Sequence, residues 1–372
     1  MKKDQAKKTK EKPVVRKEIE EMIPYSAPLE GRRSFLRLDF NENTVGPSPK
    51  VVKALHNISA KEISIYPEYG GLSKAVIENI NSKKIINPFD SNQIGIFNGV
   101  DAAINAIFHS FGDKEDYCLT TSPTFGYYNP CAQMRGMKLI EIPYKTEKFE
   151  YPTNEIKRIL VEKNPKLLLI CNPNNPTGTV ISPRLIKKFS LLSPKTLIVI
   201  DELYEAFYGN SIIKELDSNK NPNIVVLKSL SKIEGLAGLR IGFAIGNPEI
   251  IERIKRVTGP YDINTLAVKA AFAALDDQEY TNQYILDVKA ARKWIKGKLL
   301  DNNIDSHFGG GNYFLIWPKC GYKIVESSLK NSNILVRSMN NKPLLSGSLR
   351  ISIGTTKQMK RLWEALSSIN NL

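Results

Sequence analysis

The sequence predicts an α/β fold: a large domain with a mostly parallel sheet covered by helices on both faces, plus a smaller α+β C-terminal domain. Short apolar runs alternate with helix-length segments from about residue 94 to residue 245, a pattern typical of parallel sheets. After roughly residue 260 the pattern changes to long amphipathic helices followed by further short strands. With 372 residues and 42% hydrophobic content, the chain is large enough for both cores.

The strands expected in the first domain are short runs dominated by apolar residues. They are Ile94 to Phe97, Tyr117 to Thr120, Lys138 to Ile142, Leu167 to Cys171, Thr196 to Ile200, Ile224 to Leu227 and Ile241 to Ile245. Helices are expected between them at Asp101 to Phe111, Asn154 to Glu162 and Ser182 to Ser190, the last opened by a Ser-Pro start signal. Ligand sites in such folds lie beyond the carboxyl ends of the strands, so these ends are where chemistry is expected.

The second domain is expected to combine long helices with a few strands. The helices are Leu266 to Leu275 and Tyr280 to Leu300, and the strands are Tyr313 to Trp317, Ile334 to Arg337 and Leu349 to Ile353. We therefore divide the chain into a basic disordered tail (1–22), an N-terminal arm (23–45), a large domain (46–260) and a small domain (261–372).

The formal net charge of +15 lies partly in the tail and is otherwise dispersed. Residues 1–17 contain eight lysines and arginines against two acidic residues, a net of +6. The remaining excess is spread over surface segments without the aromatic-interleaved basic motif of an RNA-binding protein. A solvated surface is favoured over a specific nucleic-acid interface.

Several classes of protein are disfavoured by what the sequence lacks. No apolar stretch approaches the roughly 18 residues of a membrane span, and the basic N-terminus lacks the apolar segment of a secretory signal. We therefore expect a cytoplasmic protein. The four cysteines are widely spaced and the three histidines show no metal-like spacing, so neither a disulfide framework nor a metal site is expected.

Lys232 is the first candidate for a chemical role. It lies in the run from Ser229 to Arg240, with hydroxyls just before it, glycines just after it and an arginine eight residues on. Hydroxyls, a glycine turn and a guanidinium are suited to hold a phosphate, and an amine beside them is what a pyridoxal phosphate Schiff-base site needs. A lysine near serine and glycine is more often a solvated loop residue, so the interpretation depends on the other strand ends.

Other strand ends carry groups that suit the same cofactor. Residues 98–103 form a glycine turn leading into a helix, whose free N–H groups could hold a phosphate, although a plain turn would look similar. In the loop 172–178, which is dense in turn residues, Asn175 can donate to a ring oxygen. An aspartate such as Asp201 commonly caps a helix, but a carboxylate here could also keep a pyridine nitrogen protonated, with Tyr204 sharing the ring oxygen.

With these motifs together, the chain resembles the fold-type I, class I and II aminotransferases, which use pyridoxal phosphate. The motifs occur in the family's order and spacing: Asn41-Glu42-Asn43, Tyr66-Pro67, Asn98 to Asp101, Ser122 to Gly126, Asn175 to Gly178, Asp201 to Tyr204, the Lys232 segment, and Leu349 to Gly354.

The resemblance implies a role for each matching residue. Lys232 would be the catalytic Schiff-base lysine, Asp201 the partner of the pyridinium, Asn175 and Tyr204 the partners of the ring oxygen, and Phe125 the stacking aromatic. The cofactor phosphate would be bound by Val100, Asp101, Ser229, Ser231, Arg240, and Tyr66 of a second subunit. A homodimer with shared active sites follows from the resemblance.

Within the family, the closest likeness is to the histidinol-phosphate aminotransferases. The likeness rests on three segments: Ile23 to Tyr25, Leu38 to Asn43, and Ile334 to Arg337 with Leu345 to Arg350. It implies that Tyr25, Asn43, Arg337 and Arg350 bind the substrate, and paired guanidiniums suit a phosphate monoester. Arg337 could instead be a surface strand residue. The chain departs from the pattern at Thr44, at Val100 and at Ile233-Glu234.

The resemblance implies transfer of an amino group between histidinol phosphate (imidazole acetol phosphate) and the 2-oxoglutarate/glutamate pair, a step of histidine biosynthesis. Lys232 would move the proton between substrate and cofactor. Aromatic amino-acid aminotransferases and phosphothreonine decarboxylases share the cofactor residues and stay open as alternatives. A non-catalytic basic binding protein would need those residues to have decayed, and none of them has.

Overall fold

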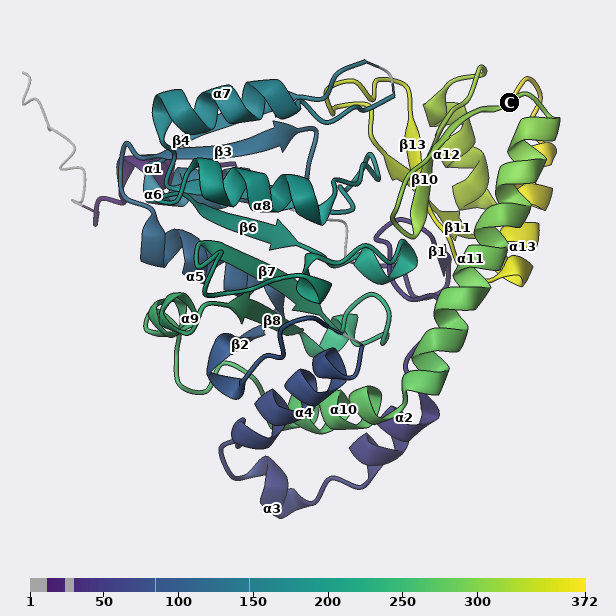
Figure 1. Cartoon of the computed structure of the whole chain (residues 1–372). Helices are drawn as coiled ribbons and strands as arrows, with labels where there is room; N and C mark the ends of the chain where they lie inside the picture. The colour runs from purple at the N-terminus through teal and green to yellow at the C-terminus, as the bar shows by residue number, and fades with distance from the viewer. Residues whose placement is uncertain (1–11, 24–29, 84, 147) are drawn as a thin grey trace, which may run out of the picture.

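The larger sheet of this computed structural model, which describes residues 12–23, 30–83, 85–146 and 148–372, has seven strands in the order β2-β8-β7-β6-β5-β3-β4 (Figure 1). β8 alone runs opposite to the other strands of the sheet, so the sheet is mostly parallel, as predicted. Its strands are β2 (Ile94–Asn98), β3 (Tyr117–Ser122), β4 (Lys138–Pro143), β5 (Leu167–Cys171), β6 (Leu197–Asp201), β7 (Ile224–Ser229) and β8 (Ile241–Gly246).

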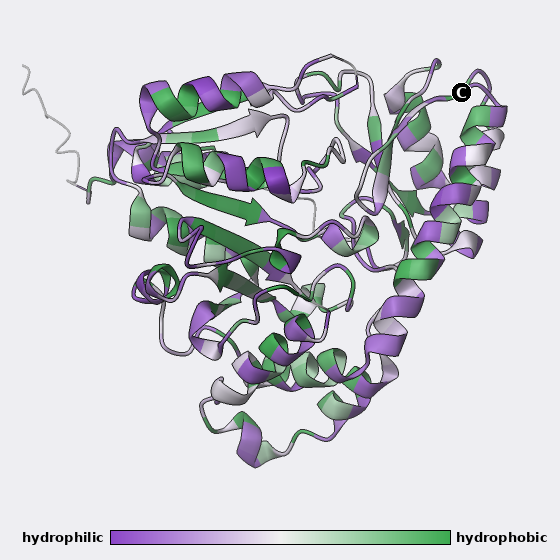
Figure 2. Ribbon diagram, in the orientation of Figure 1, coloured by the Kyte–Doolittle hydropathy of each residue, from purple (hydrophilic) through white to green (hydrophobic). Residues whose placement is uncertain are grey.

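Helices cover both faces of this sheet. In β6, Ile198 and Ile200 pack into one apolar cluster, whereas Leu197 and Val199 pack into another, because successive side chains of a strand point to opposite faces. The first face is covered by α2 (Pro49–His56), α4 (Gly70–Asn81), α7 (Thr153–Lys163), α8 (Pro183–Leu192) and α10 (Thr265–Asp276). The other face is covered by α5 (Gly99–Phe111), α6 (Tyr128–Arg135) and α9 (Pro248–Lys255). Figure 2 shows hydrophobic central strands between helices of mixed hydropathy, as expected for a sheet buried on both sides.

The second unit is built on a four-stranded antiparallel sheet in the order β12-β13-β10-β9. Its strands are β9 (Asp305–Phe308), β10 (Tyr313–Trp317), β12 (Arg337–Ser338) and β13 (Leu349–Ser352). The helices that pack on it are α11 (Gln278–Asp301), α12 (Tyr322–Asn331) and α13 (Thr356–Ser367), which enclose a separate apolar cluster. Figure 1 shows α11 extending from α10 along the outside of this unit.

The strand predicted over Ile334 to Arg337 is divided in the structure. β11 (Ile334–Leu335) pairs in parallel with β1 (Leu36–Arg37), whereas β12 pairs with β13, so the chain changes partners at Val336. The apolar run alone does not reveal this, because both halves carry side chains suited to a strand. The change of partner brings the N-terminal arm into contact with the second unit.

The arm continues from β1 into residues 38–46, here called the strap, which crosses to the carboxyl-end edge of the large sheet. Backbone hydrogen bonds join Leu38 to Leu335 and to Ser352, and Asn43 Nδ2 donates to the carbonyl of Ile233 at 2.8 Å. The strap is thus bonded to both units.

Part of the predicted tail is ordered against the large domain. Residues 17–20, which the sequence places in a disordered segment, form α1 (Lys17–Glu20). Arg16 donates to the carbonyl of Met134 at 2.9 Å, and Glu18 lies 3.0 Å from Lys114. These contacts to the large domain account for the difference.

Neither a membrane span nor a metal cluster is found among the described residues. None of the helices in the described part of the chain is long and apolar enough to cross a membrane. The same residues contain no group of three or more His, Cys, Asp or Glu side chains that could hold a metal ion. Cys118, Cys131 and Cys171 are buried and unpaired.

Candidate active site

A cavity of about 450 Å³ opens where the carboxyl ends of the large sheet meet the strap and the second unit. This is the position at which α/β folds of this kind bind ligands. The predicted site residues that line the cavity are Val100, Asp101, Phe125, Asn175, Asp201, Tyr204, Ser229, Ser231, Lys232, Arg240, Arg337 and Arg350. Residues from segments far apart in the sequence therefore share one space.

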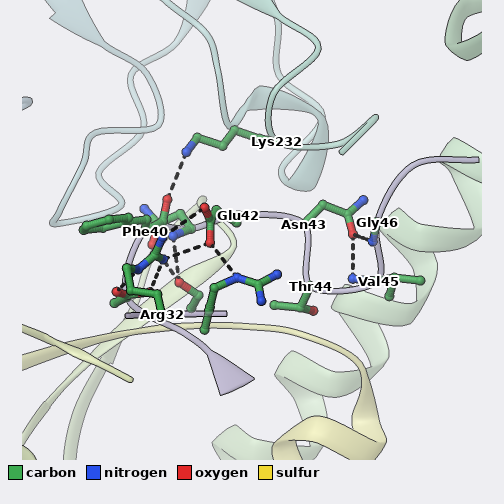
Figure 3. Close-up of polar contacts among 12 residues, drawn as sticks. Arg32, Phe40, Glu42, Asn43, Thr44, Val45, Gly46 and Lys232 are labelled. Carbon is green, nitrogen blue, oxygen red and sulfur yellow. Dashed lines mark hydrogen bonds and ion pairs between the residues drawn. The ribbon is translucent and has the colours of Figure 1, made fainter. Parts of the chain in front are cut away.

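Lys232 lies on the turn after β7, and its amine is held by the strap. Nζ donates to the carbonyl oxygen of Phe40 at 2.9 Å (Figure 3). Burial, followed by the charge of Arg350, lowers the pKa of Lys232 to about 8, with Glu42 and Asp101 acting in the opposite direction. The neutral form, which attacks an aldehyde or accepts a proton, is therefore far more populated near pH 8 than in a solvated lysine.

Asp201 ends β6 with its side chain almost fully buried, at 3% exposure. Each carboxylate oxygen accepts one hydrogen bond, Oδ2 from the hydroxyl of Tyr128 at 3.0 Å and Oδ1 from the N–H of Leu203 at 3.2 Å. Burial raises the pKa of Asp201 to about 6, although both hydrogen bonds oppose the change. The next helical segment begins only at Glu205, so Asp201 does not cap a helix there. Among the residues that the structure describes, Asp201 forms no ion pair, and a buried carboxylate of this kind fits a pyridinium nitrogen.

The first turn of α5 and Arg240 form one end of the cavity. Gly99 has a φ of +80°, and a Cβ added to it would lie 2.5 Å from Nη2 of Arg240. Only glycine therefore lets the helix start this close to the guanidinium. Arg240 Nη2 is 2.8 Å from Oδ2 of Asp101, so the guanidinium is held beside the free N–H groups of the helix.

Two hydroxyls complete this end of the cavity. Ser229 Oγ lies 2.9 Å from Ser231 Oγ and 3.0 Å from the carbonyl of Ile241. The N–H of Ser231 donates to Ser229 Oγ at 3.0 Å, which closes a tight turn before Lys232. Together with Val100 at the start of α5, these groups form a concave set of donors suited to a phosphate.

The middle of the cavity is lined by a phenol, an amide and an aromatic ring. The hydroxyl of Tyr204 accepts from Asn41 Nδ2 at 3.3 Å and from Asn175 Nδ2 at 3.5 Å. Phe125 packs edge-on against Tyr128, with ring centroids 5.6 Å apart, and presents its ring to the cavity. A flat ring bearing a hydroxyl would meet aromatic packing on its face and polar groups at its edge.

The far end of the cavity carries two guanidiniums from paired strands. Arg337 in β12 is directly opposite Arg350 in β13, and both line the cavity. Arg350 is 7% exposed, and its Nη1 donates to Asn175 Oδ1 at 2.6 Å. Arg337 lies with its Cζ 5.6 Å from the centre of the Phe40 ring. The strand register therefore explains why both arginines face one space.

Three predicted residues do not line this cavity. Tyr66 is 69% exposed and stacks on Tyr261, with ring centroids 3.9 Å apart. Asn43 is buried beside the Lys232 turn, where its Oδ1 accepts from the N–H groups of Val45 and Gly46 (Figure 3). Tyr25 lies outside the described residues.

Glu234, one of the departures noted in the sequence, lines a separate cavity of about 130 Å³ behind the Lys232 turn. Burial raises the pKa of Glu234 to about 7, with Lys83 and Lys228 acting in the opposite direction. Its Oε2 is buried without a hydrogen-bond partner among the residues that the structure describes. This carboxyl does not line the larger cavity, and so the departure does not alter its shape directly.

Residues that sequence reasoning missed include Tyr128, Phe40 and Arg32. The sequence indicates Tyr128 as a site residue only weakly: a tyrosine three residues after Phe125 is expected on the helix that follows β3. Phe40 lies directly before the Asn41-Glu42-Asn43 motif, and its apolar side chain does not indicate a role in the site. Arg32 is one of two adjacent arginines, of which only this one is buried.

Comparison with known proteins identifies the family of this site. The family model for aminotransferase class I and II matches residues 33–366. The chain belongs to this family. The histidinol-phosphate aminotransferase of Buchnera aphidicola is 30% identical to this aminotransferase over 97% of the chain and 98% of the relative. A dihydroxyacetone phosphate transaminase of Campylobacter jejuni is also 30% identical, over 94% of this chain and 95% of the relative.

Solved structures agree on the fold. The histidinol-phosphate aminotransferase of Sinorhizobium meliloti, in complex with pyridoxal-5'-phosphate, superposes with a TM-score of 0.83. The match covers 95% of this chain and 96% of that chain at 23% identity. The aminotransferase thus has the fold-type I architecture predicted from its sequence.

Class I and II aminotransferases use pyridoxal 5'-phosphate, and the cavity fits it. The donor set at the start of α5 suits the phosphate, and a Cβ at Gly99 would displace the Arg240 guanidinium from this set. The buried Asp201 suits the ring nitrogen, and the amine of Lys232 lies in the same space. The cofactor predicted from the sequence is therefore the cofactor of the family.

Proposed function

We propose that this aminotransferase moves an amino group between histidinol phosphate (imidazole acetol phosphate) and the 2-oxoglutarate/glutamate pair, as a step of histidine biosynthesis. The observation that carries the proposal is the cross-strand pair of Arg337 and Arg350 in the cavity. Like charges directly opposite one another destabilise a sheet, so their presence favours a ligand that neutralises both. A phosphate monoester does so, since its oxygens can accept from both guanidiniums.

The names of the relatives support a phosphorylated substrate. The Buchnera relative is named for histidinol phosphate and the Campylobacter relative for dihydroxyacetone phosphate, and both span nearly all of the chain. The two substrates share a phosphate ester and differ in the group that the rest of the cavity must accept. The cavity volume of about 450 Å³ is within the range of small-molecule sites.

Each residue of the cavity has a separate role in the proposed transamination. Pyridoxal phosphate, when bound, supplies an aldehyde and an electron-withdrawing ring. Asp201 would hold the ring nitrogen, Tyr204 and Asn175 would bind the ring oxygen, and Phe125 would stack on the ring, since all four line the cavity. Lys232, whose pKa of about 8 leaves much of it neutral at mildly alkaline pH, accepts and returns the proton at the substrate Cα.

Substrate comparison tests the proposal. We expect kcat/KM with 2-oxoglutarate to be highest for histidinol phosphate, and lower for unphosphorylated histidinol, phenylalanine and phosphothreonine. Glutamate with dihydroxyacetone phosphate forms a further arm of the comparison. A higher kcat/KM for phenylalanine would favour an aromatic aminotransferase, and loss of CO₂ from phosphothreonine would favour a decarboxylase.

A variant of the proposed anion site gives a second test. Arg337→Gln should lower kcat/KM for histidinol phosphate by about tenfold to a hundredfold, the usual range for one or two charge-assisted hydrogen bonds. Its effect on phenylalanine should be small. Arg158→Gln is the matched control, because Arg158 lies on α7 in an exposed ion pair with Glu162. Equal losses on both substrates would contradict the assignment of Arg337.

We also propose a homodimer in which Tyr66 of each subunit serves the phosphate end of the other's cavity. Tyr66 is exposed and absent from its own cavity, as is expected of a residue that acts in a second copy. The neighbouring apolar side chains Ile63, Ile65 and Tyr261 are 63%, 54% and 55% exposed. Such a patch suits an interface between subunits.

Subunit mixing tests this arrangement. A hybrid of Lys232→Ala and Tyr66→Ala subunits would contain one cavity with both native residues. We expect mixed and refolded subunits to regain activity that neither variant has alone. No gain in a preparation shown by sedimentation to be dimeric would place Tyr66 in its own subunit's site or outside catalysis.

The two sheets support the domain division drawn from the sequence. We propose a large cofactor-binding domain over residues 46–260 and a small domain over 261–372, with residues 23–45 as the arm. α10 belongs to the small domain by this numbering but packs in the core of the large one. α10 thus connects the small domain to the core of the large domain.

A further inference from the structure

The N-terminal arm and the strap together contain a group of charged residues that neutralise one another. Arg32 donates to both carboxylate oxygens of Asp39, at 2.9 and 2.7 Å, and to Oε2 of Glu42 at 2.9 Å. Arg37 Nε lies 3.3 Å from the same oxygen of Glu42. Although burial opposes its charge, the hydrogen bonds to Asp39 and Glu42 raise the pKa of Arg32 above its usual value. Two cations and two anions thus form a neutral, bonded group.

Phe40 is carried at the centre of this group and faces the cavity. Its carbonyl oxygen accepts from the amine of Lys232, and its ring lies 4.0 Å from Cζ of Arg32. The same ring lies 5.6 Å from Cζ of Arg337. One residue is therefore in contact with the catalytic amine through its backbone and with two guanidiniums through its side chain.

The two arginines over this ring differ in their other partners. Arg32 is held by two carboxylates, whereas Arg337 makes no ion pair or side-chain hydrogen bond with any residue that the structure describes. The face of an aromatic ring attracts a cation, and the attraction grows when the site is shielded from water. The Phe40 ring is thus a contact of the Arg337 guanidinium that leaves its N–H donors available to an anion.

We propose that Phe40 is a positioning residue, whose ring holds Arg337 toward the anionic group of the substrate and so sets the preference for phosphorylated substrates. This proposal rests on the proposed function, because it assumes that Arg337 binds the substrate's anion. It assigns to the side chain of Phe40 a role in substrate affinity, while the backbone carbonyl of the same residue serves Lys232.

The test compares Phe40→Leu and Phe40→Met, which keep apolar bulk but remove the ring, with Phe40→Tyr, which keeps the ring. All three keep the backbone carbonyl that meets Lys232. We measure kcat and KM for histidinol phosphate, and the inhibition constant of inorganic phosphate in the glutamate half-reaction, followed by cofactor absorbance. Phe111→Leu is the matched control, since Phe111 is also partly buried but packs on the far face of the sheet.

Removing the ring should raise KM for histidinol phosphate and the inhibition constant of phosphate by about five- to thirty-fold, the value of one shielded cation–π contact. Phe40→Tyr should restore both to within about twofold of the wild-type values, because a phenol ring retains the attractive face. The maximal rate of the glutamate half-reaction should change much less. A purely structural role would instead reduce all of the rates together. It would also lower the urea midpoint of the ring-less variants.

The outcomes separate this proposal from the proposed function. If the wild type does not use histidinol phosphate but is inhibited by phosphate, the substrate assignment fails and the phosphate constants still decide the role of Phe40. If histidinol phosphate is the best substrate and the Leu, Met and Tyr variants have equal KM, the role of Phe40 is wrong and the function stands. Absence of phosphate inhibition in the wild type would overturn the Phe40 proposal. Since two ring-less variants are used, failure of one to fold leaves the comparison intact.

Discussion

The ionised carboxylate of Asp201 should destabilise the fold of the apoprotein and stabilise that of the holoenzyme. The variant Asp201→Asn separates these two effects. Burial raises the pKa of Asp201 from 3.8 to about 6. A carboxyl with a raised pKa in the folded state binds more protons when folded than when unfolded, so its contribution to stability is present below pH 4 and is lost as pH rises through 6. The shift of about two pKa units corresponds to about 3 kcal/mol at 1.36 kcal/mol per unit. The side chain is nearly inaccessible to water, so screening by solvent removes little of this value.

Urea unfolding of the cofactor-free protein at pH 4.5 and 7.5 measures this contribution. Relative to Asp201→Asn, the wild type should lose about 2 kcal/mol of unfolding free energy between the two pH values, because part of the total is already lost at pH 4.5. Any pH-independent cost of the new amide beside Tyr128 cancels in this difference. Asp113→Asn, at a side chain that is 91% exposed, controls for the loss of one charge. With cofactor present, the wild type should instead be the more stable of the two proteins at pH 7.5, because the amide of Asp201→Asn cannot pair with a ring cation. A stability difference that does not vary with pH would refute the reasoning.

Three further predictions concern the cofactor end of the cavity. Lys232→Ala should abolish turnover, and borohydride treatment should no longer attach the cofactor to the chain; transamination at an ordinary rate would disprove the assignment. Tyr128→Phe removes a buried donor to Asp201, so the apoprotein should bind pyridoxal phosphate about tenfold more weakly in a fluorescence titration. Gly99→Ala should lower both the melting temperature and cofactor affinity, because of its φ of +80° and its contact with Arg240. Gly297→Ala, in open space on α11, should instead leave the protein as stable or slightly more stable.

The large sheet could be predicted because its signal is local. Each strand is a short apolar run, and the observed strands begin within one residue of the predicted ones, as at β6 (Leu197–Asp201) against the predicted Thr196 to Ile200. The second unit was harder, because β9 (Asp305–Phe308) consists of three polar residues followed by one phenylalanine and carries no continuous apolar run. The division of Ile334 to Arg337 depends on which strands lie beside it, and that is a tertiary property.

The candidate site likewise contains residues that could be predicted from the sequence and residues that could not. Lys232 and Asp201 were predictable from their motifs, because each stands at a fixed offset from a strand end. Tyr128, by contrast, meets Asp201 across 73 residues of sequence, and Phe40 meets Lys232 across 192. No periodicity connects such pairs. Their contacts arise from the packing of α6 against the sheet and from the path of the strap.

The contacts of Arg350 connect substrate binding to the basicity of the catalytic amine. Its charge is the second cause, after burial, of the lowered pKa of Lys232. An anion bound to Arg350 offsets that charge, so the amine becomes more basic when substrate is present than when the cavity is empty. Arg350 also donates to Asn175, which in turn donates to Tyr204, so the same event reaches the groups around the ring oxygen. An amine that is neutral enough to react before binding and more basic afterwards suits both of the tasks proposed for Lys232, attachment of the cofactor and acceptance of the substrate proton.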